Sequence, residues 1–151
     1  MRPSIAVIDA SLVVEALVPG TYTRLAREVL EELSGRAALV APSGLLQAEV
    51  LNGLRKALHR GVISSLTPAV EALRRLPLAY ITVDHMLVAL SAEVMRATGA
   101  SGQDAVYIAL ALMLNAELYT LDAGQASAAV RMLGAEKTHY IPGDASKRRG
   151  V

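Results

Sequence analysis

The sequence contains no cysteine among its 151 residues. A disulfide framework and a thiolate metal site are therefore both excluded. Long apolar runs are also absent, since the longest uncharged run, roughly residues 105–116, is too short to span a bilayer. The first eighteen residues are apolar but contain Asp9 and Glu15, and no cleavage-type signal follows, so we expect no secretion peptide. These absences favour a cytoplasmic protein with no membrane association.

Linkers, low-complexity blocks and regular repeats are absent too. A chain of this length most often forms one domain with a sizeable core, so we expect a single domain over residues 1–151. Residues 145–151 form a short basic tail, which we interpret as a solvated end rather than a nucleic-acid arm. The 53% hydrophobic content is more than one small monomer readily buries. It predicts a homodimer, a higher homo-oligomer or a protein partner.

Net charge is +1, which indicates little by itself. If a metal site used four of the 14 acids, ten would remain against 15 lysines and arginines, leaving +5 and a modest attraction for polyanions. Arginine outnumbers lysine, and its planar fork suits phosphate. Compositional bias or adaptation to heat explains the arginine content equally well.

Short β-rich runs alternate with helical patterns along the chain. The predicted strands are residues 4–9, 37–42, 78–83, 117–122 and 139–142. The predicted helices are residues 12–18, 21–35, 43–61, 68–76, 84–99, 103–115 and 124–134. Ser43 and Asp84 are predicted N-caps, and Thr67 with Pro68 are predicted to form an N-cap and first turn. The alternation predicts a three-layer α/β/α sandwich with a mostly parallel central sheet of about five strands.

Three strand-like runs end in an aspartate that precedes a helix: Asp9, Asp84 and Asp122. Sheets of this kind bind ligands at the carboxyl ends of their strands. Asp9 suits an N-cap and a metal ligand about equally. Asp84 has the same local pattern without a polar companion except His85, so we favour a cap there. Asp122 is either a turn residue before Gly124 or a site residue with Thr120 on the same face.

Two further acids have structural explanations of their own. Asp104 lies three residues after Ser101, a spacing typical of a capping box, and a first-turn carboxylate suits the helix dipole. The helix that follows is apolar nearly all round, which instead directs this carboxylate towards the interior. Glu49 shares one helical stripe with Asn52, Lys56 and Arg60, which is typical of a solvated face. The opposite face is predicted to carry the core residues Leu46, Val50, Leu54 and Leu58.

The joint pattern decides between separate caps and one site. The segments VIDASLVVEAL, PSGLLQAEVLNGLRKAL, DAVYIALA and LYTLDAG resemble, in order and spacing, the motifs of PIN-domain nucleases. The likeness is strongest to the small VapC-type toxins of toxin–antitoxin pairs and covers essentially the whole chain. The motifs fall on Asp9 with Ser11, Glu49 with Asn52, Asp104 with Tyr107, and Thr120 with Asp122. Asp84 lies outside them, which favours Asp9 as the site residue.

The resemblance implies an endoribonuclease that depends on Mg²⁺ or Mn²⁺. Asp9, Asp104 and Asp122 would be metal ligands, and Glu49 a ligand or the residue that orients the attacking water. Carboxylate ligands suit these hard cations, and no histidine cluster competes for zinc. Ser11, Asn52 and Thr120 would hold the carboxylates. A positively charged side chain near the pocket would position the substrate phosphates, and the candidates are Lys56, Arg55 and Arg60.

The implied partners are an RNA substrate and a small antitoxin protein that inserts a segment near the acidic pocket. Helices within residues 43–75 are candidate surfaces for self-association.

Two departures from the pattern affect the pocket. Many relatives carry a further acid shortly after the last one, whereas Gly124, Gln125 and Ala126 stand there in this sequence and leave a fifth acidic ligand unassigned. Gln103 replaces a more apolar residue in the wall.

Two other classes stay open. One is a receiver-like phosphoryl-transfer protein, which also gathers acids at strand ends. It is disfavoured because no paired acids follow the first strand and no lysine ends a later one. The other is a PIN-like RNA-binding or RNA-processing module without a toxin role, including a catalytically silent one.

Overall fold

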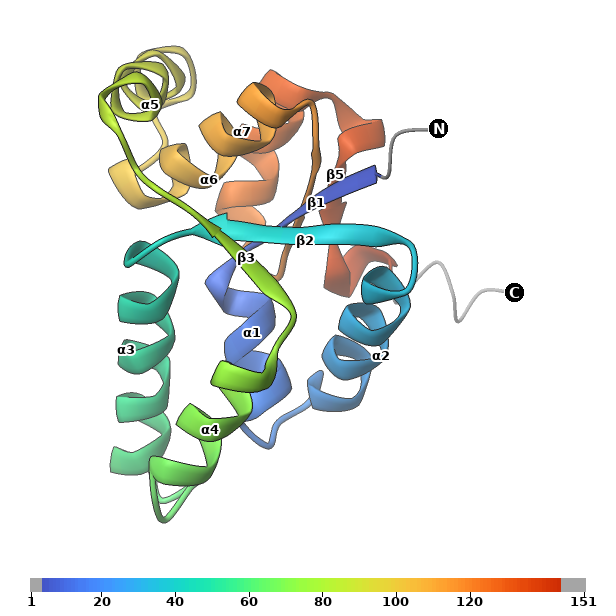
Figure 1. Ribbon diagram of the computed structural model, residues 1–151, viewed down its shortest axis with the longest axis vertical. Helices are drawn as coiled ribbons and strands as arrows, with labels where there is room; N and C mark the ends of the chain where they lie inside the picture. Colours follow the sequence, from blue (N-terminus) through green and yellow to red (C-terminus); the bar gives the residue numbers. More distant parts are fainter. Residues whose placement is uncertain (1–3, 145–151) are drawn as a thin grey trace.

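The computed structural model describes residues 4–144. Strands and helices alternate along this part of the chain (Figure 1). The strands are β1 (Ser4–Ile8), β2 (Ala37–Pro42), β3 (Leu78–Ile81), β4 (Glu117–Thr120) and β5 (Thr138–Tyr140). The helices are α1 (Ala10–Leu17), α2 (Thr23–Ser34), α3 (Leu45–His59), α4 (Thr67–Arg75), α5 (His85–Thr98), α6 (Gly102–Leu114), α7 (Ala123–Leu133) and the 3₁₀ turn η1 (Ala135–Lys137).

All five strands run parallel, in the order β3-β2-β1-β4-β5. The chain leaves β1 towards β2 and β3 on one side, then returns to place β4 on the other side of β1. This reversal makes the carboxyl ends of β1 and β4 the topological switch point, where open α/β sheets bind their ligands. The predicted three-layer α/β/α fold with a five-stranded parallel sheet is confirmed.

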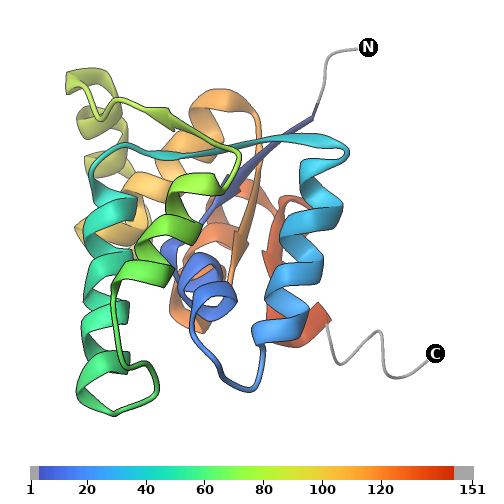
Figure 2. The same cartoon turned by 60° about the horizontal axis from the view of Figure 1, so that its bottom comes forward.

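Helices cover both faces of the sheet, as a parallel sheet requires. Helices α6 and α7 pack on one face and α1, α2 and α3 on the other, with α5 against α6 and α4 against α1 (Figures 1 and 2). The most buried helix is α6, in which Ala105 and the run from Tyr107 to Ala111 are buried. It is apolar nearly all round because it lies between the sheet and two helices. None of the helices between residues 4 and 144 has the length and apolar content needed to cross a membrane.

Local boundaries differ from the predictions at several places. Helix α3 begins at Leu45, not after a Ser43 cap, because Gly44 has a φ of +82° and its N–H donates to Gln47 Oε1 at 2.7 Å. Thr67 is already helical, so Leu66 is the N-cap of α4. Leu58 is 37% exposed rather than core. The α3 face instead continues through the smaller Ala57, which is 6% exposed.

Four predicted strands are too long at their carboxyl ends, since β1 stops at Ile8 and β4 at Thr120, and β3 and β5 are shorter as well. Strand β3 stops at Ile81, and β5 covers Thr138–Tyr140 because the chain turns helical at Ile141. The predicted cap at Asp84 is confirmed, since its Oδ1 accepts the Leu87 N–H at 2.9 Å. The basic tail, residues 145–151, lies outside the described residues.

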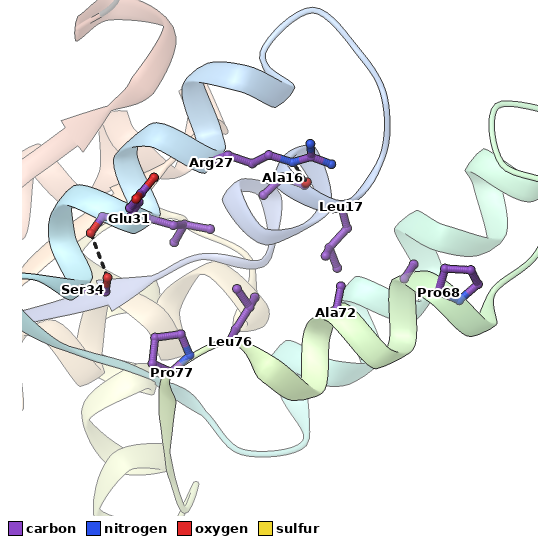
Figure 3. Close-up of a pocket in the computed structure, with 11 residues that line it drawn as sticks. Ala16, Leu17, Arg27, Glu31, Ser34, Pro68, Ala72, Leu76 and Pro77 are labelled. Atoms are coloured by element: carbon purple, nitrogen blue, oxygen red, sulfur yellow. Dashed lines mark hydrogen bonds between the residues drawn. The ribbon is translucent and has the colours of Figure 1, made fainter.

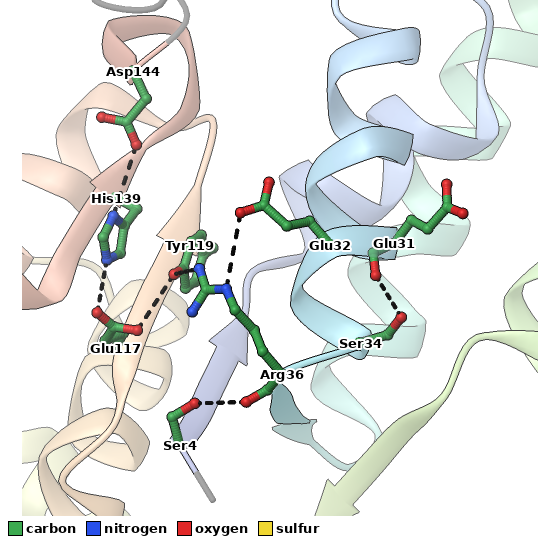
Figure 4. A network of polar contacts seen from close by, with 9 residues as sticks. All are labelled: Ser4, Glu31, Glu32, Ser34, Arg36, Glu117, Tyr119, His139 and Asp144. Carbon is green, nitrogen blue, oxygen red and sulfur yellow. Dashed lines mark hydrogen bonds and ion pairs between the residues drawn. The ribbon is translucent and has the colours of Figure 1, made fainter.

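A polar network on the side of the sheet that faces α2 joins β4 and β5 to the residue before β2 (Figure 4). His139 lies between two carboxylates, with Nε2 3.1 Å from Glu117 Oε1 and Nδ1 3.7 Å from Asp144 Oδ2. Its ring stacks on Tyr119 at a centroid distance of 4.3 Å. Arg36, just before β2, donates to the Tyr119 hydroxyl at 3.4 Å. These contacts join β4 and β5 to the start of β2.

Candidate functional site

An acidic cavity of about 450 Å³ opens at the switch point, beyond the carboxyl ends of β1 and β4. It is lined by Asp9, Ala10, Ser11, Val14, Glu15, Glu49, Asn52, Gly53, Lys56, Gln103, Asp104, Leu121 and Asp122. All four predicted site acids are therefore brought to one cavity from four separate segments. We call it the acidic pocket.

Asp9 is the most enclosed of these acids, at 5% exposed. It follows β1 directly and caps α1, as Ser11 N–H donates to Asp9 Oδ2 at 3.3 Å. The Ser11 hydroxyl donates to the same oxygen at 2.5 Å, and the Thr120 hydroxyl does so at 3.0 Å. Burial raises the pKa of Asp9, against the opposing effect of these hydrogen bonds. Asp9 is thus both a helix cap and a member of the pocket.

Asp122 has the same double character. Its Oδ1 accepts the Gln125 N–H at 2.9 Å and so caps α7. Its own N–H donates to Thr120 Oγ1 at 2.9 Å. Thr120, completely buried at the end of β4, therefore contacts both aspartates from behind the pocket. The Ser11 hydroxyl adds a further link by accepting the Leu121 N–H at 2.9 Å.

Asp104 and Glu49 come from the helices that border the cavity. Asp104 occupies the first turn of α6, where its N–H donates to Ser101 Oγ at 3.2 Å, so the predicted cap is present. Glu49 lies one turn into α3, on the stripe that faces the cavity. Its Oε1 is enclosed, as is the hydroxyl of Tyr107 on α6, and neither makes a hydrogen bond of good geometry among the described residues. The two enclosed groups lie beside each other, since each affects the pKa of the other.

The pocket disfavours negative charge when nothing else is bound. Burial raises the pKa of Glu49 to about 7, with further contributions from the charges of Asp9, Asp104 and Asp122, although the nearby Tyr107 hydroxyl opposes the shift. Burial, and then the charges of Asp122 and Asp9, raise the pKa of Asp104 to about 6. Burial likewise raises the pKa of the Tyr107 hydroxyl. A cation in the cavity would offset this repulsion directly.

The donor set fits a hard divalent cation. The four site acids supply oxygen donors, and neither histidine nor cysteine lines the cavity. Between residues 4 and 144, no three acidic or histidine side chains already form a compact metal-binding cluster. The carboxylates instead surround the open cavity, which suits Mg²⁺ because it keeps several of its waters and binds through one or two carboxylates.

The remaining predicted residues divide clearly. Lys56 lines the pocket, whereas Arg55 and Arg60 are exposed and do not. Asn52 also lines it, but no hydrogen bond within the described chain joins its side chain to the four acids. Gln103 is in the wall as predicted. Asp84 is not, because it follows β3, the edge strand farthest from β4.

Three pocket features were not predicted. Glu15 lines the cavity one turn after Ser11 on α1, a spacing that could have indicated it, and its Oε1 accepts the Tyr22 N–H at 2.9 Å. Gly53 lets α3 approach α1, since a Cβ there would lie 2.7 Å from Val14 Cγ2. Gln125, noted in the sequence only as a missing acid, is completely buried beside Asp9.

A second cavity, of about 520 Å³, lies on a different part of the molecule, between α1, α2 and α4 (Figure 3). Its lining is largely apolar, with Leu17, Ala72 and Leu76 facing it. Arg27 lies at its edge, where its Nε donates to the Ala16 carbonyl at 2.8 Å. With a single acid, Glu31, it lacks the donors of a metal site.

The fold and the pocket together define an α/β protein with four carboxylates at the switch point of its sheet, an arrangement suited to binding a divalent cation. The family model for the PIN domain matches residues 6–131, and the chain belongs to the PIN-domain family. PIN domains are generally nucleases and typically use divalent metal ions. This membership favours a nuclease over the receiver-like alternative. No curated protein sequence matches the chain significantly.

Proposed function

We propose that the protein is an endoribonuclease that depends on Mg²⁺ or Mn²⁺ and cleaves RNA in the acidic pocket. The observation that carries this proposal is the convergence of Asp9, Glu49, Asp104 and Asp122 on one cavity at the switch point. The pKa values of Asp9, Glu49 and Asp104 are all raised, so the metal-free pocket disfavours the negative charge of these carboxylates. A stable helix cap alone would not require acids from four segments to meet.

In this proposal Asp9, Asp104 and Asp122 hold the metal. A bound divalent ion supplies charge neutralisation, Lewis acidity and an acidified water. Glu49 either contacts the metal, directly or through water, or orients the water that attacks phosphorus, and its pKa of about 7 suits a group that accepts a proton. Ser11 and Thr120 fix the Asp9 carboxylate from behind. Asn52 makes no hydrogen bond to the four acids among the described residues and is better placed to meet substrate than to position them.

Lys56 is the basic residue in the pocket wall and would position a substrate phosphate. It lies two turns after Glu49 on the same α3 stripe, so a phosphodiester bound to it would extend towards the acids. Arg55 and Arg60 are exposed and do not line the pocket, and they would contribute only to general attraction for a polyanion.

We further propose that the protein is the toxin of a toxin–antitoxin pair acting in the cytoplasm. A small antitoxin would then be its partner, and a segment inserted near the acidic pocket would block it. Exposed apolar residues on and after α3, among them Leu51 (49% exposed) and Val62 (45% exposed), support self-association through residues 43–75. The test is a short reading frame abutting this one, whose product should copurify with the protein and suppress its RNA cleavage.

The cleavage experiment separates this function from a silent binding module. Purified protein should cut unstructured RNA with Mg²⁺ or Mn²⁺ and stop when EDTA is added. Asp9→Asn and Asp104→Asn should each abolish cleavage. Asp84→Asn is the matched control, because Asp84 also caps a helix after a strand but lies outside the pocket, and asparagine preserves the cap. Equal cleavage by all three variants would refute the site assignment, whereas RNA binding without turnover would identify a silent module.

A further inference from the structure

Gln125 occupies an unusual environment for an amide. It lies in the first turn of α7, is completely buried and contacts the most enclosed acid of the pocket. With its amide oriented to match these neighbours, Nε2 lies 3.1 Å from Asp9 Oδ2, 3.3 Å from Asp9 Oδ1 and 2.8 Å from Thr120 Oγ1. The opposite orientation would direct the amide oxygen at these acceptors, so the contacts themselves fix the assignment.

A buried amide is stabilising only where its donors are used, since an unpaired donor loses its hydrogen bonds to water without gaining others. An apolar side chain would fill the same space without that requirement. Ser11 and Thr120 reach only Oδ2 of Asp9, whereas Gln125 also reaches Oδ1. It therefore restrains the carboxylate from a second direction and limits rotation about the last bond of the side chain.

The main chain of Gln125 contacts a second acid. Its N–H donates to Asp122 Oδ1 at 2.9 Å. One residue thus binds Asp9 through its amide and Asp122 through its backbone, although the two acids follow different strands. Because β1 and β4 are neighbours in the sheet, this double contact sets how the two carboxylates lie relative to each other.

We infer that Gln125 is a positioning residue that orients Asp9 against Asp122 so that both can bind the same divalent cation. This inference rests on the proposed metal-dependent function and deepens it. Gln125 does not itself contact the cation. The neutral amide restrains Asp9 without adding a negative charge to a pocket that is already lined by five acids.

The test uses Gln125→Met, which keeps the length of the side chain and removes both donors. Leu33→Met, a volume-conserving change in the core on α2, is the control for altering a buried residue. Free Mn²⁺ is titrated by electron paramagnetic resonance, without RNA and at a temperature where circular dichroism shows each variant folded. Mn²⁺ affinity should fall about 10-fold or more in Gln125→Met and stay unchanged in Leu33→Met. In RNA cleavage, kcat should fall with KM unchanged.

A purely structural role predicts a different pattern, in which Gln125→Met loses thermal stability but binds Mn²⁺ within twofold of the unaltered protein. That result would overturn the inference. If the unaltered protein does not bind Mn²⁺, the proposed function fails instead. Whether Gln125 positions Asp9 is then tested on the metal-free protein. There, nuclear magnetic resonance should show slowly exchanging Gln125 side-chain amide protons whose shifts move in Asp9→Asn. Rapid exchange of these amide protons, or chemical shifts that stay the same in Asp9→Asn, would overturn the inference that Gln125 positions Asp9. This measurement needs no folded Gln125 variant.

Discussion

Replacing Glu49 with glutamine should stabilise the metal-free protein. The pKa of Glu49 is raised from 4.5 to about 7, first by burial and then by the charges of Asp9, Asp104 and Asp122. The folded protein therefore keeps a proton that the unfolded chain releases above pH 4.5. Stability consequently falls as pH rises from 4.5 to 7, and the full penalty is present above pH 7. Glutamine has the same shape and carries no charge to penalise.

The size of the effect follows from this shift. A shift from 4.5 to about 7 corresponds to roughly 3 kcal/mol. Glu49 is only half-buried, and solvent screening reduces the value to about 1–2 kcal/mol. For a chain of this length, the melting temperature of Glu49→Gln at pH 8 should then rise by about 3–6 °C.

The assay is thermal unfolding followed by circular dichroism in EDTA, at pH 8 and at pH 5. At pH 5 the folded protein keeps the proton and the unfolded chain gains only a little free energy by releasing it, so the difference between the two proteins should be clearly smaller than at pH 8. Glu31→Gln, on the exposed side of α2, is the matched control and should change little at either pH. Saturating Mg²⁺ should reverse the order at pH 8, because it stabilises the unaltered protein more strongly. No stabilisation in EDTA at pH 8, or an equal gain at pH 5, would refute the electrostatic account of the pocket.

Three other substitutions test separate parts of the site. Gly53→Ala should destabilise the protein by about 1–3 kcal/mol in urea unfolding, because its Cβ would lie 2.7 Å from Val14 Cγ2, and adding Val14→Ala should restore part of the loss. Lys56→Ala should raise KM for RNA and weaken the dependence of KM on salt concentration, with little change in kcat. A fall in kcat alone would contradict a phosphate contact. Thr120→Val should lower stability by about 1–3 kcal/mol in urea unfolding, since it removes the hydroxyl that donates to Asp9, and unchanged stability would show that this hydrogen bond is dispensable.

Local sequence patterns predicted the elements well because apolar periodicity is a local property. The run 37–42 coincides with β2, and the apolar helix after Asp104 is the most buried one. Errors arose where tertiary context decides. Gly44, with its positive φ, moves the start of α3 past Ser43, and Leu58 lies beyond the part of α3 that the core covers.

The site could be predicted only as a joint pattern. Asp9, Asp84 and Asp122 all cap helices after strands, so no local feature separates them. What separates them is sheet order, since β1 and β4 are neighbours and β3 lies at the far edge. Gln125 was missed because an amide in an alanine-rich helix gives no sign of burial. Its role depends on Asp9, more than a hundred residues away in sequence.

The most direct test of the account is a crystal of the protein soaked in Mn²⁺ and measured for anomalous scattering. We predict a peak in the acidic pocket, bounded by Asp9, Asp104 and Asp122 and within direct or water-mediated reach of Glu49. The peak should be lost in crystals of Asp104→Asn. A strong Mn²⁺ peak only elsewhere on the molecule, with the pocket empty at saturating Mn²⁺, would contradict the claim that these carboxylates form a metal-binding nuclease site.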